Sequence, residues 1–165
     1  MNKNFSNNVK NILLFSREEA GRLHNTTVGV EHILLGMIRD SNSKASAVIH
    51  RLGVNLKALK LDIDEELFKD GRYISENQMV IDKSVENLLR LSLLESMNLN
   101  SGQTDTEHLL LAMLKNKDSA AARILENHRL DYNKVYDFLL KEKGIDRPVH
   151  APRMGAGFTE DEEDD

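Results

Sequence analysis

One short pattern occurs twice in this chain of 165 residues. Residues 28–40 read VGVEHILLGMIRD, and residues 104–116, 76 positions later, read TDTEHLLLAMLKN. The same offset, applied without gaps, places apolar residues opposite apolar residues along most of each copy. Chance does not preserve apolar positions over such a length, so we interpret the chain as two copies of one folding unit, over 5–67 and 81–143.

Apolar residues recur at helical spacing in both copies, which predicts four helices in each. In the first copy we expect helices over 9–23, 30–40, 44–52 and 56–68, with Gly53 ending the third helix and Asn55 capping the fourth. In the second copy we expect the corresponding helices, with Asp82 capping 83–99, Asp118 capping 119–128 and Asp131 capping 132–143.

Four short helices bury little apolar surface alone, whereas two copies around a pseudo-two-fold axis share one core. The predicted fold class is therefore all-α, with two four-helix repeats packed as one domain over 1–145. We expect a loop over 68–80 and a flexible acidic linker over 146–165, which leads toward a further module. The composition agrees, because both prolines of the chain lie after residue 145.

Charge and composition exclude several classes of protein. The net charge of −5 argues against a general nucleic-acid binder, which needs a basic surface. Cysteine is absent, which excludes disulfides and cysteine-based metal sites and favours a cytoplasmic protein. The first residues have no long apolar core, so we expect that they are not a signal peptide. No apolar run reaches the ~18 residues that a membrane helix requires, so we expect no membrane partner.

The segments GVEHILLGMIRD and TEHLLLAMLKN, each followed by an alanine-rich helix, resemble the N-terminal (Clp N) domain of Clp-type AAA+ unfoldases. The stretch NVKNILLFSREEAGRLHNTT is most similar to the ClpC branch, and the tail GFTEDEEDD is similar to the linker of ClpC proteins from Bacteroides-like bacteria. In that family the domain is a mobile module on an ATP-driven hexameric ring, which threads substrates into the ClpP peptidase. The resemblance implies a domain that docks protein substrates and adaptor proteins.

The chain has no G-x-x-x-x-G-K-[ST] phosphate-binding loop. We therefore expect no ATP hydrolysis and no cofactor in this chain, since ATP and Mg²⁺ would belong to the AAA+ modules of a longer parent. We also expect no catalytic residues and a monomeric isolated domain that reaches ClpP only through the parent ring.

The resemblance further implies that the glutamate of each repeated segment, Glu31 and Glu107, helps to bind phosphorylated arginine. The free N–H groups of a helix start attract a phosphate, and a carboxylate in the first turn accepts from a guanidinium. The candidate ligand-binding residues are Gly29, Val30, Glu31, His32, Thr106, Glu107 and His108.

A capping role for the glutamates stays open beside the ligand role. Thr104 to Glu107 fits a capping box, in which Glu107 closes its own helix. The first copy has Val28 at the position of Thr104, so no hydroxyl occupies its helix start. Asp105 adds a negative charge where a phosphate would lie, and we therefore expect tighter phosphoarginine binding at the Glu31 helix start.

The Glu-His pairs also raise the alternative of a stand-alone helical enzyme or a metal-binding protein. The chain has no H-E-x-x-H motif, and adjacent residues point to different sides of a helix. No spacing typical of a nucleophile and its base accompanies the pairs. We therefore favour packed, hydrogen-bonded roles for His32 and His108, with no metal site.

Overall fold

The computed structural model describes residues 4–68 and 78–144. Its contacts divide the chain into two units, residues 1–132 and 133–165, and each is described by itself. The described part of the second unit continues helix α8 from Asn133 and ends at Gly144. Along the described ranges, no helix combines the length and the apolar character needed to cross a bilayer.

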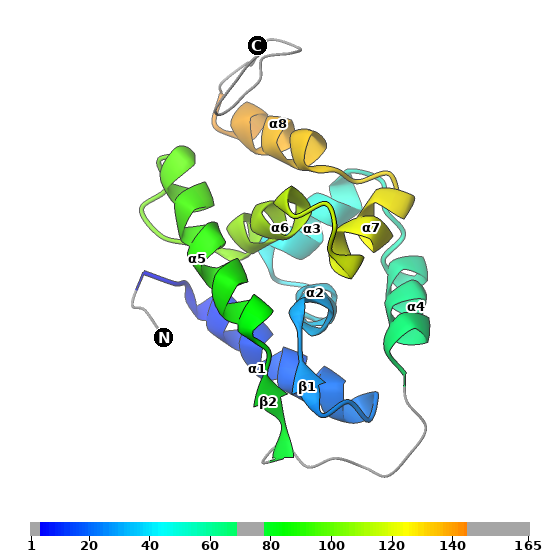
Figure 1. Cartoon of the computed structure of the whole chain (residues 1–165). Helices are drawn as coiled ribbons and strands as arrows, with labels where there is room; N and C mark the ends of the chain where they lie inside the picture. The colour runs from blue at the N-terminus through cyan, green and yellow to red at the C-terminus, as the bar shows by residue number, and fades with distance from the viewer. Residues whose placement is uncertain (1–3, 69–77, 145–165) are drawn as a thin grey trace. The chain divides into compact units, whose positions relative to one another are not determined.

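The predicted duplication is confirmed in the helices (Figure 1). Each helix of the second repeat begins 76 residues after its counterpart in the first. This agreement establishes an all-α double repeat. The first repeat contains α1 (Asn7–Arg22), β1 (Thr27–Val28), α2 (Val30–Arg39), α3 (Lys44–Arg51) and α4 (Leu56–Leu67), and the second contains β2 (Val80–Ile81), α5 (Lys83–Asn98), α6 (Thr106–Lys115), α7 (Ala120–Asn127) and α8 (Tyr132–Glu142).

The turns between helices repeat with the same offset. His24 and Asn100 both have left-handed backbones, with φ of 61° and 55°, after α1 and α5. Gly53 has φ of 92° after α3, and its counterpart Arg129 has φ of 66°. The predicted helix end at Gly53 is confirmed, because this conformation is one that glycine adopts without strain.

Two of the predicted helix caps are confirmed and one is wrong. The side chains of Asn55 and Asp82 accept from the backbone N–H groups at the start of α4 and α5. Asp118, however, does not cap α7. Ser119 does so, because the helix starts one residue later than predicted and the Ser119 hydroxyl accepts from the Ala122 N–H at 3.1 Å. The cap expected from Asp131 stays a prediction.

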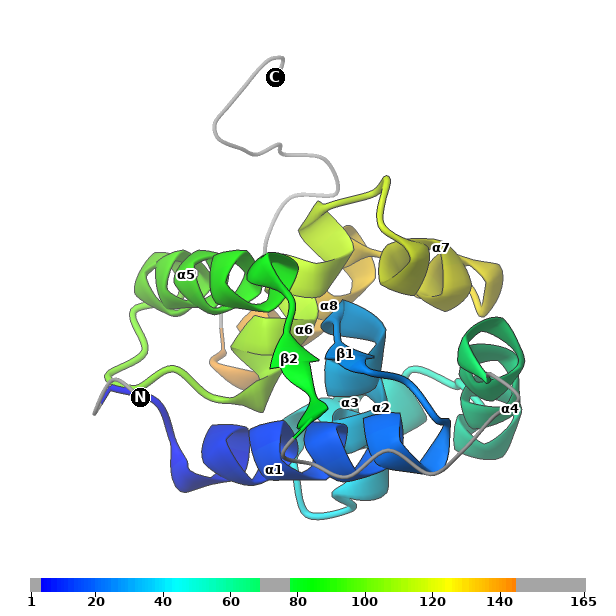
Figure 2. The same cartoon turned by 60° about the horizontal axis from the view of Figure 1, so that its bottom comes forward.

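The predicted loop over 68–80 is wrong at its end, where β2 begins. Thr27 pairs with Val80 and Val28 with Ile81 in a parallel ladder. Figures 1 and 2 show β1 leading into α2 and β2 leading into α5. The ladder continues where the Asp82 N–H donates to the Val28 carbonyl at 2.8 Å. Residues 69–77 lie outside the described part of the chain, as do 145–165, so the linker and the domain boundaries stay predictions.

A second parallel bridge repeats this pairing with the roles of the two repeats exchanged. Phe5 pairs with Thr104 in parallel, and the Ser6 N–H donates to the Thr104 carbonyl at 2.9 Å. Ser6 and Thr104 are the counterparts of Asp82 and Val28. We call these two pairings the crossed bridges: the start of each repeat is bonded to the segment before the second helix of the other.

Helix α2 lies at the centre of the first unit and contacts every other helix there. Its residues from His32 to Met37 are all buried. Gly36 allows α1 to approach closely: a Cβ atom at this position would lie 2.7 Å from the Ile12 carbonyl oxygen. The counterpart of Gly36 in α6 is Ala112, so the two repeats differ at this contact.

Replacement of Gly36 by alanine is expected to lower the free energy of unfolding by about 1–3 kcal/mol, because α1 must move to accommodate the methyl group. Intrinsic helix propensity alone would raise stability by about 1 kcal/mol, so the sign of the change reports the steric contact. Urea unfolding followed by circular dichroism measures it. Gly102→Ala is the matched control, since a Cβ there meets no atom within 4 Å. A Gly36→Ala protein as stable as wild type would contradict the close contact.

Candidate docking site at the repeated helix starts

A histidine closes the first turn of both central helices. The Gly29 N–H donates to His32 Nδ1 at 2.9 Å, and the Asp105 N–H donates to His108 Nδ1 at the same distance. Both imidazoles are buried. Burial of these rings follows from their position on the inward side of helices that are covered on most sides.

The capping box expected from Thr104 to Glu107 is therefore wrong. The cap residue is Asp105, so the third helical position falls on His108 instead of Glu107. The Thr104 hydroxyl is 2.8 Å from the Ser96 hydroxyl instead. The sequence misled because an aspartate directly after the threonine moves the helix start by one residue, and an imidazole nitrogen then accepts where a carboxylate was expected.

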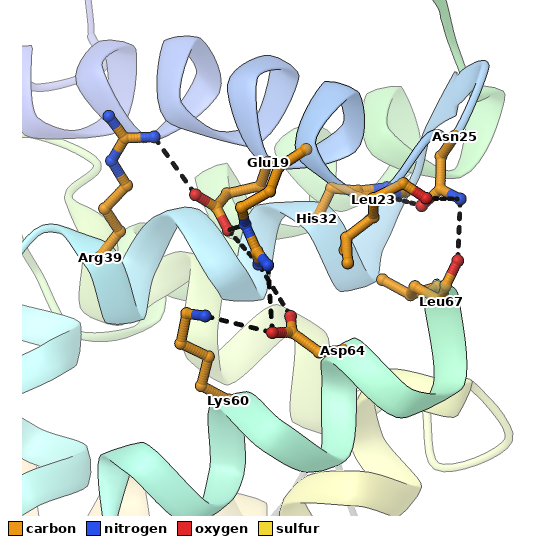
Figure 3. A network of polar contacts seen from close by, with 9 residues as sticks. Glu19, Leu23, Asn25, His32, Arg39, Lys60, Asp64 and Leu67 are labelled. Carbon is orange, nitrogen blue, oxygen red and sulfur yellow. Dashed lines mark hydrogen bonds and ion pairs between the residues drawn. The ribbon is translucent and has the colours of Figure 1, made fainter. Parts of the chain in front are cut away.

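His32 also connects the helix start to two other helices (Figure 3). Its Nδ1 atom accepts, so its Nε2–H donates to the Asn25 side-chain oxygen at 2.6 Å. Asn25 in turn donates to the Leu67 carbonyl at 2.8 Å and to the Leu23 carbonyl at 3.3 Å. Both ring nitrogens are thus used within the protein. Among the described residues, no group of three or more potential ligands is placed to hold a metal ion.

A charged network lies beside this connection and fixes α1, α2 and α4 in the first repeat (Figure 3). Glu19 is buried and accepts from Arg22 at 2.6 Å and from Arg39 at 3.2 Å. Arg22 also pairs with Asp64 at 2.8 Å, and this hydrogen bond raises the pKa of Arg22. Burial acts against ionisation of Asp64, but hydrogen bonds from Arg22 and Lys60 outweigh it and lower its pKa. The network therefore joins α2, which carries the first helix start, to α1 and α4.

The first helix start opens into a hollow of about 470 Å³. Gly29 has no side chain to fill it, and the backbone N–H groups of Val30 and Glu31 have no acceptor among the described residues. The other walls come from the second repeat. The lining residues are Thr27, Gly29, Val30, Glu31, His32, Asp82, Ser84, Asn87, Leu88, Leu91, Ala112, Met113, Asn116, Ser119 and Ala120.

The charged side chains of this lining are Glu31 and Asp82, and both are acidic. A hydrogen bond from the Ser84 hydroxyl, joined by the Ser84 backbone N–H, lowers the pKa of Asp82 and keeps it ionised. Glu31 is half-buried and has no cationic partner among the described residues. The hollow thus combines helix N–H donors, which favour an anionic group, with two carboxylates, which favour a cationic one.

The second helix start is filled by the chain itself. The Asp105 carboxylate accepts from the Ser6 hydroxyl at 2.7 Å and from the Thr106 N–H at 2.8 Å. The Thr106 hydroxyl accepts from the Ala45 N–H at 2.9 Å. Gly29 stands in the place of Asp105 in the first repeat, so no carboxylate accepts from the Val30 N–H there, and Val30 has a methyl group where Thr106 has its hydroxyl.

The structure thus brings four of the candidate residues together and separates the rest. Gly29, Val30, Glu31 and His32 line one hollow. Thr106 and His108 are buried, with 0% and 2% of their surface exposed, and Glu107 is half-buried beside them. Sequence reasoning missed Asp82 as a member of the site, because its position as the cap of α5 gave no sign that it lies against the other repeat.

These features define an all-α double repeat with one open helix start between its copies. The chain belongs to the Clp repeat (R) N-terminal domain family, whose model matches residues 4–128 and again 80–157. It is 31% identical over 92% of its length to the ATP-dependent Clp protease ATP-binding subunit ClpA homolog of Guillardia theta. It is 29% identical over 95% of its length to the chloroplastic chaperone protein ClpC2 of Arabidopsis thaliana.

The chain spans only 18% and 16% of the length of these two relatives. Solved structures share the fold at low sequence identity. The N-terminal domain of ClpD from Arabidopsis thaliana has a TM-score of 0.66 at 18% identity, over 86% of this chain and 96% of that chain. A ClpV N-domain in complex with a VipB peptide has a TM-score of 0.66 at 16% identity, over 82% of this chain and 84% of that chain.

The position of His32 predicts a loss of stability in mild acid. Burial lowers the pKa of His32 to about 4, against 6.5 for a free imidazole, while the charge of Glu19 opposes the shift. As the pH falls, the imidazole is therefore protonated in the unfolded chain before it is protonated in the folded one. The contribution of His32 to the free energy of unfolding is complete above pH ~6.5 and falls by on the order of 2–3 kcal/mol as the pH approaches 4. Urea unfolding at several pH values measures this slope.

A glutamine at position 32 is expected to flatten the slope, since no titrating group remains there. His50→Gln is the matched control, because His50 is exposed at the end of α3. The same acid slope in His32→Gln and wild type would show that another group causes the loss.

Proposed function

We propose that this chain is a docking module of a Clp-type ATPase, which receives protein substrates and adaptor proteins at the Glu31 hollow. The observation that carries this proposal is the open helix start, where unused N–H groups and a carboxylate face a hollow that the second repeat completes. The ClpV N-domain complex supports it, because a protein of the same fold binds a peptide. In the parent protein, ATP-driven modules would unfold the bound substrate and pass it to ClpP.

We further propose that the hollow binds phosphorylated arginine. The N–H groups of Val30 and Glu31 suit the phosphate, since a helix start favours an anion. The Glu31 carboxylate suits the guanidinium nitrogens. Asp82 opposes the phosphate from the far wall, so a single site has modest affinity. A substrate with several marks gains affinity by reaching several domains of one ring.

Glu31→Ala is expected to weaken the binding of free phosphoarginine about tenfold or more, because a charge-assisted hydrogen bond contributes roughly 1.5–3 kcal/mol. Glu107→Ala is the matched control from the second repeat and is expected to have little effect. Asp82→Asn keeps the cap of α5 and is expected to strengthen binding, because it removes the opposing charge. Isothermal titration calorimetry compares the four proteins. Wild-type affinity in Glu31→Ala with unchanged helical content would refute the role of Glu31.

The competing function is a stand-alone enzyme or metal-binding protein that uses the Glu-His pairs. The engagement of both His32 nitrogens inside the protein favours the docking function instead. We expect purified 1–165 to show no ATPase or peptidase turnover, with or without a chelator. Turnover that persists through repeated purification and disappears with a chelator would restore the competing function.

A further inference from the structure

An apolar face on α5 continues outward from the Glu31 hollow. Leu91 lines the hollow, and Leu94 and Met97 follow at intervals of three residues, so the three form an oblique ridge that turns by about 60° at each step around the helix. Their side chains are 39%, 54% and 67% exposed. Three large apolar side chains in a row on one helix form a surface of the kind that partner proteins cover.

The first repeat covers the corresponding face of α1 with its own residues. The counterparts of Leu91 and Leu94 are Phe15 and Glu18. The Arg39 guanidinium lies 4.6 Å from the centre of the Phe15 ring and pairs with Glu18 at 2.6 Å. This face of α1 is therefore partly covered and charged.

The second repeat has no such cover over its face. Lys115, the counterpart of Arg39, lies 3.6 Å from Glu95 and 5.2 Å from the centre of the Tyr132 ring. Its ammonium group is thus directed to another pair of side chains. The repeats differ here at Leu94 in place of Glu18, at Met97 in place of the buried Gly21, and at Lys115 in place of Arg39. These differences leave the α5 face bare among the described residues.

The acidic end of this surface indicates what a partner must carry. Glu31 and Asp82 lie in the hollow at the end where the apolar row begins, and neither has a cationic partner among the described residues. A basic side chain complements them. The C-terminal segment of the chain, 159–165, carries only negative charge. It is therefore disfavoured by charge as the occupant of this surface.

The step along the row indicates the conformation of the partner. Residues three apart in a helix rise by about 4.5 Å, which matches the step of a second helix that presents residues i and i+3 or i+4. Residues on one side of an extended strand are about 6.6 Å apart and do not keep this register.

We propose that the α5 face and the Glu31 hollow together bind an amphipathic helix of a partner protein, with an arginine or lysine in the hollow and two apolar residues over Leu94 and Met97. The inference rests on the proposed docking function and names the class of segment that docks. The Glu31 carboxylate contacts the basic side chain, and the apolar row supplies the remaining buried area. Phosphorylation of the arginine is not required for this mode of binding.

The probe is a fluorescein-labelled, alanine-based helical peptide with arginine, leucine and leucine at positions i, i+4 and i+7, titrated with the whole chain by fluorescence anisotropy. Leu94→Ser is expected to weaken binding about tenfold, as loss of one buried leucine contact implies. Leu61→Ser is the matched control, because Leu61 is 62% exposed on α4, away from the α5 face. A peptide with glutamate in place of arginine is expected to bind at least about tenfold more weakly to wild type.

Free phosphoarginine, titrated into Leu94→Ser, separates the two proposals. We expect it to bind this variant as it binds wild type, because Leu94 is outside the hollow. Equal peptide affinity for wild type, Leu94→Ser and Leu61→Ser would overturn the helix inference, while phosphoarginine binding that depends on Glu31 would still support the proposed function. A wild-type dimer in light scattering that Leu94→Ser converts to monomer would also overturn it, since a second copy would then cover the face.

Discussion

Burial of the two central helices is the constraint on which the rest of the structure depends. Each central helix begins with backbone N–H groups that the carbonyls of the helix cannot satisfy. A neutral imidazole accepts from one of them in both repeats, the N–H of the cap residue, at His32 and His108. Because an imidazole carries no charge in this state, α2 and α6 enter the core without the cost of burying an ionised carboxylate.

The crossed bridges join the start of each repeat to the other repeat within residues 1–132. Ser6 bonds to the second repeat as Asp82 bonds to the first, which is the reciprocal pattern of a two-fold dimer interface, here within one chain. The helices of the two repeats begin at matching positions, and the helix starts differ in their side chains. The Asp105 carboxylate caps one helix start, whereas Gly29 leaves the N–H groups of the other open to the hollow.

Much of the fold could be predicted because it follows from local pattern. The offset of 76 and the spacing of apolar residues placed the helices, and Asn55, Asp82 and Gly53 ended or began them as expected. Cap positions failed where two suitable residues are adjacent, as at Asp118 and Ser119, since sequence alone does not choose between neighbours. Only part of the candidate site could be predicted from the sequence. Glu31 belongs to a repeated motif, but its hollow depends on packing between the repeats, which no local pattern contains.

The long reach of the N-terminal bridge has a consequence for how this chain is made. The Ser6 hydroxyl bonds to Asp105, 99 residues further along the sequence. A chain that leaves the ribosome from its N-terminus therefore exposes residues 4–6 while the whole first repeat and the second repeat as far as Asp105 are synthesised. During this interval the start of α1 lacks its partner strand. Formation of the contact between Ser6 and Asp105 is then a late step in folding. Until it forms, the backbone of residues 4–6 is unpaired, and this is the segment that a chaperone would most need to cover.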